Sequence, residues 1–586
     1  MVPRAAACSL AGALPVATLG APAGLIRCPT GFRFKIKIAM DNYRLLLFVA
    51  LAFIVMMIYQ AWEEENRVTQ APAPAASSTP SAPASGSPSS AAGVPSAPPA
   101  PTAPVPFAAE AGEQVTVTTD LVRADINTQG GDIRRLLLLQ HPVSVDKPKE
   151  PFTLFQESAA DVLFAQSGMV SHGPDSPTHK VKYTTTATAY VLAPNADSLR
   201  VPLTWRGPGG VRFTKVFVFH RGSYVIDVDF QIDNPTAKPW SGYFYGQLQR
   251  SYVESGGLFA LPTYTGAAIY TPAEKYGKVS FDDMDKKPLA TETTDGWVAM
   301  LQHYFVGAWV PQAAVRTELY SQALPDRRYV IGVKNLVATE VAPGASATVG
   351  ARLFAGPKEH KRLSQVAPGL ELTVDYGWLT VISAPLFWLL SRIHGLIGNW
   401  GWSIILLTVL IKLVFYPLSA TSYKSMANMK KLQPKLQSLK ERFGDDRQKL
   451  NQAMMELYKT EKINPLGGCL PIVVQIPVFL ALYWVLLESV ELRQTPFIFW
   501  IRDLSTPDPY FVLPIVMGLS MYVQQLLNPQ PPDPMQRRIF MVMPVAFTVM
   551  FLFFPAGLVL YWVVNNVLSI LQQWRITRVV AAKSNA

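Results

Sequence analysis

Long apolar runs lie near both ends of the chain, and the region between them has none. Residues 43–62 would extend about 30 Å as an α-helix, which is enough to cross a bilayer. Further runs predict spans at 400–419, 465–488, 510–527 and 539–574. The last would reach about 54 Å as one helix, so Pro555 and Gly557 predict a break into spans 539–554 and 555–574. We therefore expect a polytopic α-helical membrane protein with six transmembrane helices, five of them in a C-terminal bundle.

The charges beside these spans predict their orientation. Lys and Arg precede the first span and three glutamates follow it, which places the N-terminus in the cytoplasm. The basic segment 420–464 and the tail 575–586 are predicted to be cytoplasmic for the same reason, together with the short loop 528–538. The loop 489–509 then falls on the periplasmic side. The expected topology is a multi-pass protein of the cell inner membrane with both termini in the cytoplasm.

A further apolar segment, 378–400, repeats apolar residues at helical spacing but is interrupted by Arg392 and His394. A span here would move the basic segment 420–464 outside the cell, against the tendency of positive loops to stay in the cytoplasm. We therefore interpret 356–399 as a connector that ends in an amphipathic helix on the periplasmic membrane surface.

The N-terminal region predicts an anchor and a tether. Residues 40–62 form the anchor span, and residues 63–106 are rich in Ala, Pro and Ser, a composition typical of an extended linker. Residues 1–39 make a poor signal peptide. The segment that begins at Met40 instead has a short charged head followed by one apolar span. We interpret 1–39 as a mis-assigned start or an N-terminal extension.

Between the tether and the bundle, residues 107–355 alternate polar and apolar positions in short runs separated by Gly, Pro, Asn and Asp. This pattern predicts a large periplasmic all-β sandwich domain. The clearest hairpin joins 211–219 to 224–232 through a turn that contains Gly222. One face of its second strand is apolar, consisting of Tyr224, Ile226, Val228, Phe230 and Ile232.

Composition narrows the classes of function. Apolar residues make up 49% of the chain and charged residues 16%, which favours a membrane protein. The net charge of +11 does not indicate nucleic-acid binding, because the basic residues lie largely beside apolar segments. The three cysteines lie outside 107–355, so that domain does not depend on disulfides. The sequence has no phosphate-binding loop and no metal-ligand spacing, and we expect neither a cofactor nor a metal.

One charge lies inside a predicted span. Lys412 is placed within 400–419, where a lysine costs about 2.5 to 3.5 kcal/mol on insertion scales. Thr408, Tyr416 and Ser419 share its side of the helix. Snorkelling of the lysine to the interface is the simpler explanation. The predicted spans have no Asp or Glu in their interiors, which weighs against an ion-coupled transporter.

Other spans carry polar residues that could face Lys412. These are Gln475 in the third span and Trp562, Asn565, Asn566, Ser569 and Gln573 in the last. Ordinary hydrogen bonds between helices would explain any one of them. Together they favour a hydrophilic groove, open to the cytosol and to lipid, that receives the polar flank of a client protein.

The basic segment 420–464 also has apolar positions at helical spacing and predicts a helical hairpin. Its apolar stripe consists of Met426, Met429, Leu432, Leu436, Leu439, Phe443, Met454 and Leu457. Methionines on such a face suit adaptable binding to varied apolar clients. A spacer that binds anionic lipid headgroups is the alternative.

Several segments resemble the YidC membrane insertases of Gram-negative bacteria, which are related to the Oxa-type insertases of organelles. They include NYRLLLFVALAFIVMMIYQAW, LQPKLQSLKERFGDD, NPLGGCLPIVVQIPVFLALYWVL and MPVAFTVMFLFFPAGLVLYWVVNN. The resemblance implies that Lys412 takes the position of a groove cation that is usually Arg, and that Trp562 replaces a frequent Tyr. It also implies a periplasmic sandwich similar to sugar-binding folds.

The function implied is that of a membrane protein insertase and chaperone, not an enzyme. Its expected partners are nascent membrane proteins, the ribosome, the Sec translocon and anionic lipids, without nucleic acid. The alternatives are a secondary transporter and a membrane-anchored periplasmic carbohydrate-binding or chaperone protein. Ion flux would identify the first, and sugar binding by the β domain the second.

Overall fold

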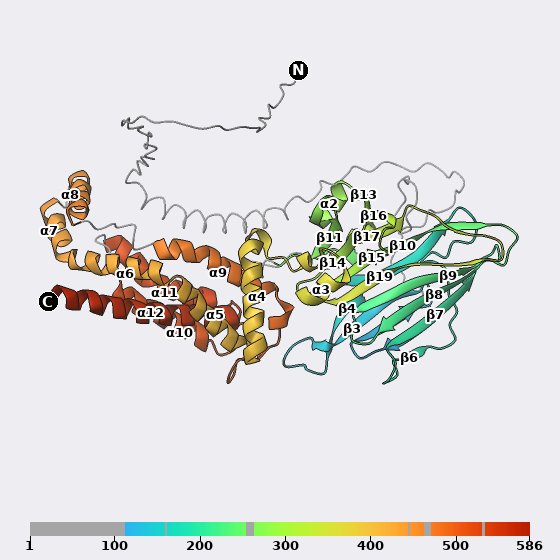
Figure 1. Ribbon diagram of the computed structural model, residues 1–586, viewed down its shortest axis with the longest axis horizontal. Helices are drawn as coiled ribbons and strands as arrows, with labels where there is room; N and C mark the ends of the chain where they lie inside the picture. Colours follow the sequence, from blue (N-terminus) through green and yellow to red (C-terminus); the bar gives the residue numbers. More distant parts are fainter. Residues whose placement is uncertain are drawn as a thin grey trace, which may run out of the picture. The chain divides into compact units, whose positions relative to one another are not determined.

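The computed structural model describes residues 112–158, 161–253, 263–443, 446–461, 470–529 and 534–585. The predicted extension, anchor span and linker lie outside the described residues. The described part contains a β domain and a set of helices (Figure 1).

The β domain consists of two antiparallel-rich sheets (Figure 1). The 11-stranded sheet runs β13 (Ala290–Thr294), β16 (Arg316–Leu324), β17 (Arg328–Asn335), β10 (Trp240–Ser251), β5 (Val162–Ser171), β4 (Pro151–Glu157), β3 (Asp132–Pro142), β2 (Val122–Asn127), β1 (Gln114–Thr118) and β6 (Ala189–Val191), with β18 (Thr339–Val341) beside β10. The 8-stranded sheet runs β12 (Lys275–Val279), β11 (Gly266–Thr271), β14 (Trp297–Leu301), β15 (Phe305–Pro311), β19 (Ser346–Pro357), β9 (Val225–Asp233), β8 (Arg212–His220) and β7 (Ser198–Arg206). The all-β sandwich prediction is confirmed.

The hairpin predicted around Gly222 forms as β8 and β9, which pair antiparallel. Gly222 has a φ of +68°, the left-handed conformation that glycine adopts without strain. The apolar face of β9 is buried, with Ile226 2% exposed and Val228 fully enclosed. Alternation at a period of two therefore predicted both the pairing partner and the buried face.

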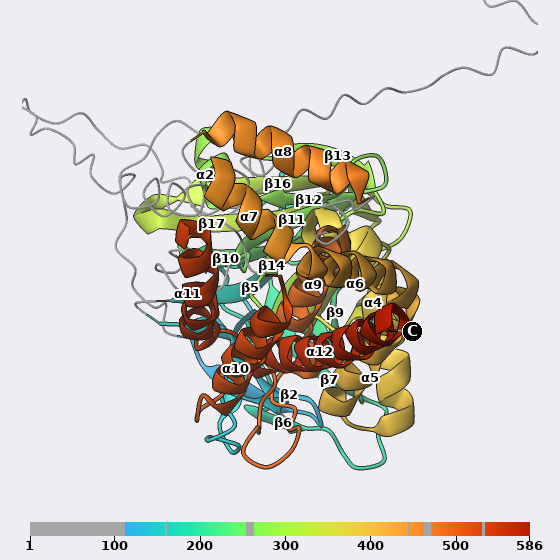
Figure 2. The ribbon, with the colours of Figure 1, turned by 90° about the vertical axis from the view of Figure 1, so that its left-hand side faces the viewer.

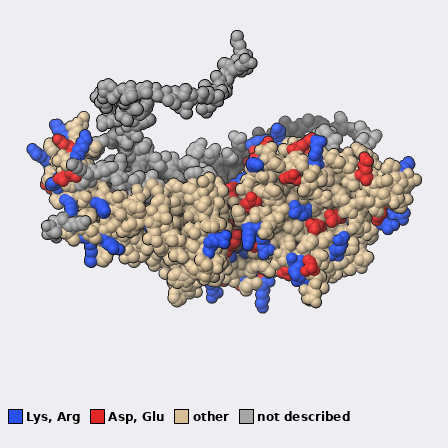
Figure 3. Space-filling model, viewed as in Figure 1, with Lys and Arg blue, Asp and Glu red and all other residues tan. Residues whose placement is uncertain are grey.

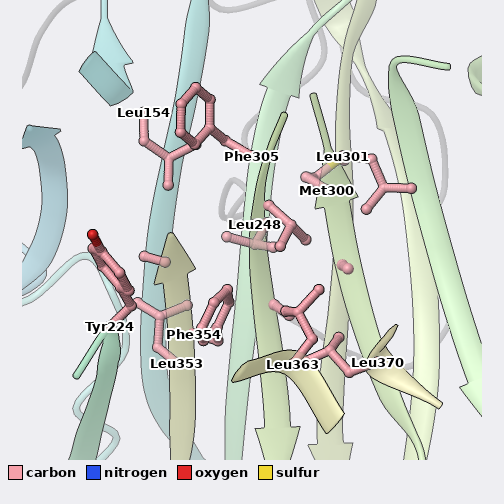
Figure 4. Close-up of a cluster of buried hydrophobic side chains, with 14 of the residues drawn as sticks. Leu154, Tyr224, Leu248, Met300, Leu301, Phe305, Leu353, Phe354, Leu363 and Leu370 are labelled. Atoms are coloured by element: carbon pink, nitrogen blue, oxygen red, sulfur yellow. The ribbon is translucent and has the colours of Figure 1, made fainter. Parts of the chain in front are cut away.

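The end of the sandwich that leads to the helices is closed by a short helix, α3 (His360–Val366), and by the 3-10 turn η3 (Leu370–Thr373). Leu363 and Leu370 are fully buried against side chains of β10, β14, β15 and β19, as Figure 4 shows. Burying a leucine contributes about 1.5 to 3 kcal/mol. The remaining short elements of the domain are α2 (Phe281–Lys286) and η2 (Pro325–Arg327).

The helical region follows the turn η4 (Gly377–Leu379). Its helices are α4 (Thr380–Ile397), α5 (Trp400–Val414), α6 (Tyr416–Lys431), α7 (Gln433–Phe443), α8 (Arg447–Thr460), α9 (Leu470–Glu488), α10 (Val512–Leu527), α11 (Pro534–Phe551) and α12 (Ala556–Asn585), with the turn η6 (Val490–Leu492) after α9. Helix α12 packs between α10 on one side and α5 and α6 on the other (Figure 2).

The predicted span 400–419 is not one straight helix. Helices α5 and α6 meet at Phe415 with a bend of 68°. Pro417 explains the break, because it has no N–H to donate to Leu413 and its ring opposes the carbonyl of that residue. The first helix of the predicted hairpin is likewise divided, into α6 and α7 at Leu432, just before Pro434.

The predicted break before the last span is present, since α11 ends at Phe551 and α12 begins at Ala556. Helix α12 continues to Asn585, so the residues predicted as a cytoplasmic tail extend the helix. They contain neither Pro nor Gly to end it.

Length and apolar composition alone identify α4 as the one described helix able to cross a membrane unaided, with a second if α5 and α6 form one bent span. Two shorter apolar helices are the segment Val474–Glu488 of α9 and helix α10. Helix α4 covers the segment that we expect to lie on the membrane surface. It runs across the direction of α5, α9 and α12 in Figure 1.

Candidate functional site

Lys412 lies where three helices meet. It belongs to the last turn of α5, its side chain is half-buried, and α12 packs against both α5 and α9 at this level. Its Nζ donates a hydrogen bond of 2.8 Å to the hydroxyl of Ser569 on α12. A longer contact of 3.5 Å joins Nζ to Oε1 of Gln475 on α9. The ammonium group is therefore held by side chains from two other helices.

Gln475 extends this network. Its Nε2 donates to Oδ1 of Asn565 and, at 3.4 Å, to the hydroxyl of Tyr561. Ser569 in turn donates to the backbone carbonyl of Asn565 at 2.7 Å. Residues 561, 565 and 569 recur every four positions, so they form one stripe along α12. We call Lys412, Gln475, Tyr561, Asn565 and Ser569 the lysine cluster.

Two polar residues predicted for the same groove face another way. Asn566 donates to Ser520 on α10 at 3.0 Å, and Gln573 donates to Asn528 at the end of that helix, also at 3.0 Å. Both side chains are buried. The polar positions of α12 thus divide into a stripe toward Lys412 and a stripe that bonds α12 to α10.

The remaining predicted groove residues differ in their surroundings. Thr408 is buried and donates back to the carbonyl of Ile404 at 2.7 Å, so its hydroxyl is satisfied within its own helix. Tyr416 lies beyond the bend with its side chain 43% exposed. Trp562 packs on Phe479 and Phe551 at ring distances of 4.8 and 5.7 Å.

Ser419 is buried and lines a small pocket beside Lys412, with room for about one water molecule. The other lining residues are Ile411, Lys412, Phe415, Leu418 and Gln475. The pocket lies at the bend between α5 and α6. A polar group that enters here meets both the ammonium and the amide.

Sequence reasoning missed Tyr561, Ser520 and Asn528. Tyr561 lies one turn before Asn565, so the spacing of the polar stripe could have included it. Ser520 lies on α10 and Asn528 directly after it, and with Gln524 they recur every four positions, so helical spacing could have indicated them too. Their role follows from the partner helix that each of them meets.

The hairpin helices α7 and α8 pack against each other, and Lys435 on α7 reaches Glu461 just after α8 at 2.6 Å. Leu432 and Leu436 are buried, whereas the other six predicted stripe residues are half-buried. These are Leu439, Phe443, Met454 and Leu457, with Met426 and Met429 half-buried on α6. The apolar stripe is therefore used in part by the pairing of α7 and α8.

Charge separates the helical region into zones. On the face shown in Figure 3, charged side chains cover the β domain and gather again around α7, α8 and the end of α12, while the surface between them is almost free of charge. Exposed apolar side chains on α5 and on α11 beyond Arg538 include Leu413, Val414, Val542 and Val545. Such a surface suits contact with lipid.

The β domain contains a lysine that is more deeply buried than Lys412. Lys215 on β8 is fully buried and donates to the backbone carbonyls of Gly130 and Ser167 at 3.1 and 2.9 Å. Nearby Asp132 is also fully buried, accepts from Gln166 at 2.9 Å and pairs with Arg134 at 3.0 Å. Burial lowers the pKa of Lys215 to about 8 and raises the pKa of Asp132. This group bonds the two sheets together.

Another buried ion pair joins the β domain to the helices. Lys358, just after β19, lies 3.1 Å from Glu488, the last residue of α9, and also donates to the carbonyl of Thr373. Both charged side chains are almost fully enclosed, at 3% and 6% exposure. Arg493, after η6, donates to the carbonyls of Pro142 and Val143. The end of α9 is thereby fixed to the β domain.

Within the described residues, His, Cys, Asp and Glu form no group that would hold a metal ion.

Comparisons with known proteins also divide the chain into a β domain and a helical region. A family model described as the YidC periplasmic domain matches residues 114–389, and one described as the 60Kd inner membrane protein matches residues 392–583. A protein named membrane protein insertase YidC from Methylobacillus flagellatus is 51% identical over 544 residues, covering 92% of this chain and 97% of the relative. One of the same name from Nitrosococcus oceani is 50% identical over 544 residues, covering 92% and 99%.

A solved structure titled "Active YidC insertase crystal structure with the first transmembrane domain resolved" covers 79% of this chain and 92% of its own. It has a TM-score of 0.37 and 17% sequence identity. The two sequence relatives align along nearly their whole length.

Proposed function

Since this chain belongs to the YidC family of membrane protein insertases, we propose that it inserts transmembrane helices of other proteins into the inner membrane and that the lysine cluster receives their polar flanks. The family resemblance read from the sequence is confirmed by these relatives. The clients are nascent membrane proteins. The assignment of the groove residues is our own proposal.

The observation that carries this proposal is the way in which Lys412 is held. Its ammonium has three N–H donors, and its acceptors are the hydroxyl of Ser569 and the amide of Gln475. Side-chain acceptors can rotate away at low cost, so a client carboxylate can take their place. A contact between charged groups is strengthened where water is scarce.

The direction of the lysine also supports a binding role. Its Nζ points to the neighbouring helix α12, whereas a snorkelling lysine extends along its own helix to the interface. The adjoining pocket, lined by Ser419 and Gln475, offers further polar contacts. In this proposal the lysine cluster is a polar binding site that a client meets between the cytoplasmic hairpin and the apolar outer surfaces of the helices.

Insertion by this route needs no nucleotide hydrolysis. Burying a client helix in lipid releases about 25 cal/mol per Å² of apolar surface, which drives the transfer. The cost lies in carrying a polar flank across the hydrocarbon layer. A cation and several amides that bind the flank on its way lower that barrier without entering the overall free-energy change.

The hairpin α7 and α8 receives clients before they reach the lysine cluster. Half-buried Met454 and Leu457 on α8, with Met426 and Met429 on α6, keep part of their apolar surface available. The basic charge of this region suits the ribosome and anionic lipid as partners. In this proposal the Sec translocon is a further partner. The proposed topology places α4 on the periplasmic membrane surface and both termini in the cytoplasm.

Substitutions at Lys412 test the proposal. In liposomes, Lys412→Arg should insert clients at the wild-type rate, because the charge is kept. Lys412→Ala should slow clients with an acidic translocated flank about tenfold and clients with a short neutral flank much less. Lys412→Glu should be slowest, since it repels the acidic flank. The measurement is the initial insertion rate, scored by protease protection of the translocated flank.

Leu413→Ala is the matched control, because Leu413 is the next residue on α5 and its side chain is 62% exposed. It should leave the rates for both clients unchanged. Equal rates for wild type and Lys412→Ala with the acidic client would refute the role of the lysine cluster while leaving family membership intact.

A further inference from the structure

A cleft of about 550 Å³ lies on the β domain, between α3 and the adjoining strands β9 and β19. Its lining residues are Gly222, Ser223, Tyr224, Val225, Arg352, Phe354, Glu359, Lys361, Arg362, Gln365 and Val366. The aromatic and aliphatic members come from the turn before β9, from β9, from β19 and from the end of α3. The charged members are Arg352, Glu359, Lys361 and Arg362, which we call the rim. We call this site the α3 cleft.

The rim is cationic. Arg352, Lys361 and Arg362 contribute three positive charges against the single negative charge of Glu359. Arg362 is already engaged, since its Nε lies 2.6 Å from Glu359 and its guanidinium packs over the ring of Tyr224. It therefore forms a fixed wall of the cleft.

Arg352 and Lys361 are differently placed. Among the described residues, neither guanidinium nor ammonium makes a hydrogen bond or ion pair, although Arg352 is half-buried on β19. Its cross-strand neighbour is Asp227, whose carboxylate accepts a 2.7 Å bond from His220. Two cations with free donors therefore face one cleft, which is the arrangement that recognises an anion with several oxygen acceptors.

The position of the cleft indicates the source of that anion. Glu359 follows Lys358, which pairs with Glu488 at the last residue of α9. The backbone at His360 lies beside Glu491, in the turn after α9. The cleft therefore lies at the level where α9 ends. On the face shown in Figure 3, the almost uncharged surface of the helices gives way to charged side chains where the β domain begins. Lipid headgroups occupy that level in a bilayer.

We propose that the α3 cleft binds a phosphate-bearing anionic group, and that its source is the headgroup of an anionic phospholipid in the periplasmic leaflet. Arg352 and Lys361 bind the phosphate oxygens. Val225 and Val366, which are half-buried, contact the glycerol and the first carbons of the acyl chains. Binding here would draw the β domain to the membrane beside α4.

The test uses the full chain in an uncharged detergent, examined by native mass spectrometry. It is titrated with short-chain phosphatidylglycerol, with short-chain phosphatidylcholine and with inorganic phosphate. The variant is Arg352→Gln combined with Lys361→Gln. The matched control is Lys147→Gln combined with Arg316→Gln, which removes two exposed cations elsewhere on the β domain.

We expect phosphatidylglycerol to bind wild type and the control at least tenfold more tightly than it binds the cleft variant. Phosphatidylcholine should distinguish none of them. Equal weakening by the control would show general attraction to surface charge and overturn the proposal. Inorganic phosphate that binds as tightly as phosphatidylglycerol, and is lost in the cleft variant, would overturn the lipid source. A thermal melt confirms that each variant is folded.

Discussion

Two lysines of this protein, Lys215 in the β domain and Lys412 in the helices, have opposite surroundings. In the β domain, Lys215 is fully enclosed and its acceptors are backbone carbonyls of Gly130 and Ser167, with Asp132 nearby. In the helices, Lys412 is half-buried and its acceptors are side chains of Ser569 and Gln475. Ser167 lies in β5 and Gly130 in the turn between β2 and β3, so strand pairing and backbone hydrogen bonds fix these acceptors, whereas side chains can change rotamer.

The comparison separates a structural cation from an exchangeable one. A cation fixed by backbone and by a buried carboxylate stabilises the fold but cannot bind anything else. A cation held by rotatable side chains beside a pocket can exchange its partners. The environment of a buried charge, more than its burial, therefore decides what the charge can do.

The largest effect is expected at Lys215. Lys215→Met should lower the free energy of unfolding of the β domain by about 3 to 5 kcal/mol, because it leaves Asp132 buried beside fewer positive charges. Pulse proteolysis in urea measures this loss. Lys238→Met, at an exposed position of the same domain, is the control and should change little. A stable Lys215→Met protein would erase the distinction between the two lysines.

A second prediction concerns the pH dependence of the stability of the β domain, through His179, which is buried near Lys215. Burial lowers the pKa of His179 to about 3, and its Nδ1 lies 2.8 Å from the hydroxyl of Tyr245. The unfolded chain therefore binds more protons below pH 6.5, so the domain loses stability as pH falls. From pH 6.5 to 4.5 the loss is about 2 kcal/mol.

His179→Gln should remove that part of the pH dependence, while His172→Gln, at an exposed position, should keep it. The measurement is the urea midpoint of the β domain at each pH. Parallel pH curves for wild type and His179→Gln would contradict the assignment.

The smallest effect compares two adjacent residues of α12. Asn566→Ala removes the bond to Ser520 and should cost about 0.6 kcal/mol without changing insertion. Asn565→Ala should cost a similar amount but also slow acidic-flank clients, because it frees Gln475 beside Lys412. Unfolding in mixed detergent and the liposome rate are both measured. Equal insertion rates for the two variants would remove Asn565 from the lysine cluster.

Local pattern predicted local structure well. Alternation gave the β8 and β9 hairpin and its buried face, and Pro555 gave the break between α11 and α12. The order of the sheets was beyond reach, because β10 pairs with both β5 and β17 across long stretches of chain. Such pairing depends on side-chain packing between segments, which one sequence does not reveal.

The candidate site was predictable as a list but not as an arrangement. Helical spacing identified Asn565, Asn566 and Ser569, yet adjacent residues on a helix point about 100° apart and meet different neighbours. Only the positions of α9 and α10 decide that Asn565 faces Gln475 and Asn566 faces Ser520. The bend at Phe415 did have a signal in Pro417, which the apolar run obscured.

The pair of Lys358 and Glu488 has a consequence for the order in which this protein is made. The two residues are 130 positions apart, and domains fold from the N-terminus as synthesis proceeds. The β domain is thus complete while Lys358 is still in water, waiting for a partner that has not been synthesised. In the proposed topology, its burial begins only when α9 has crossed the membrane and Glu488 has reached the periplasmic side. The ion pair can therefore form only after this insertase has itself been inserted as far as the end of α9.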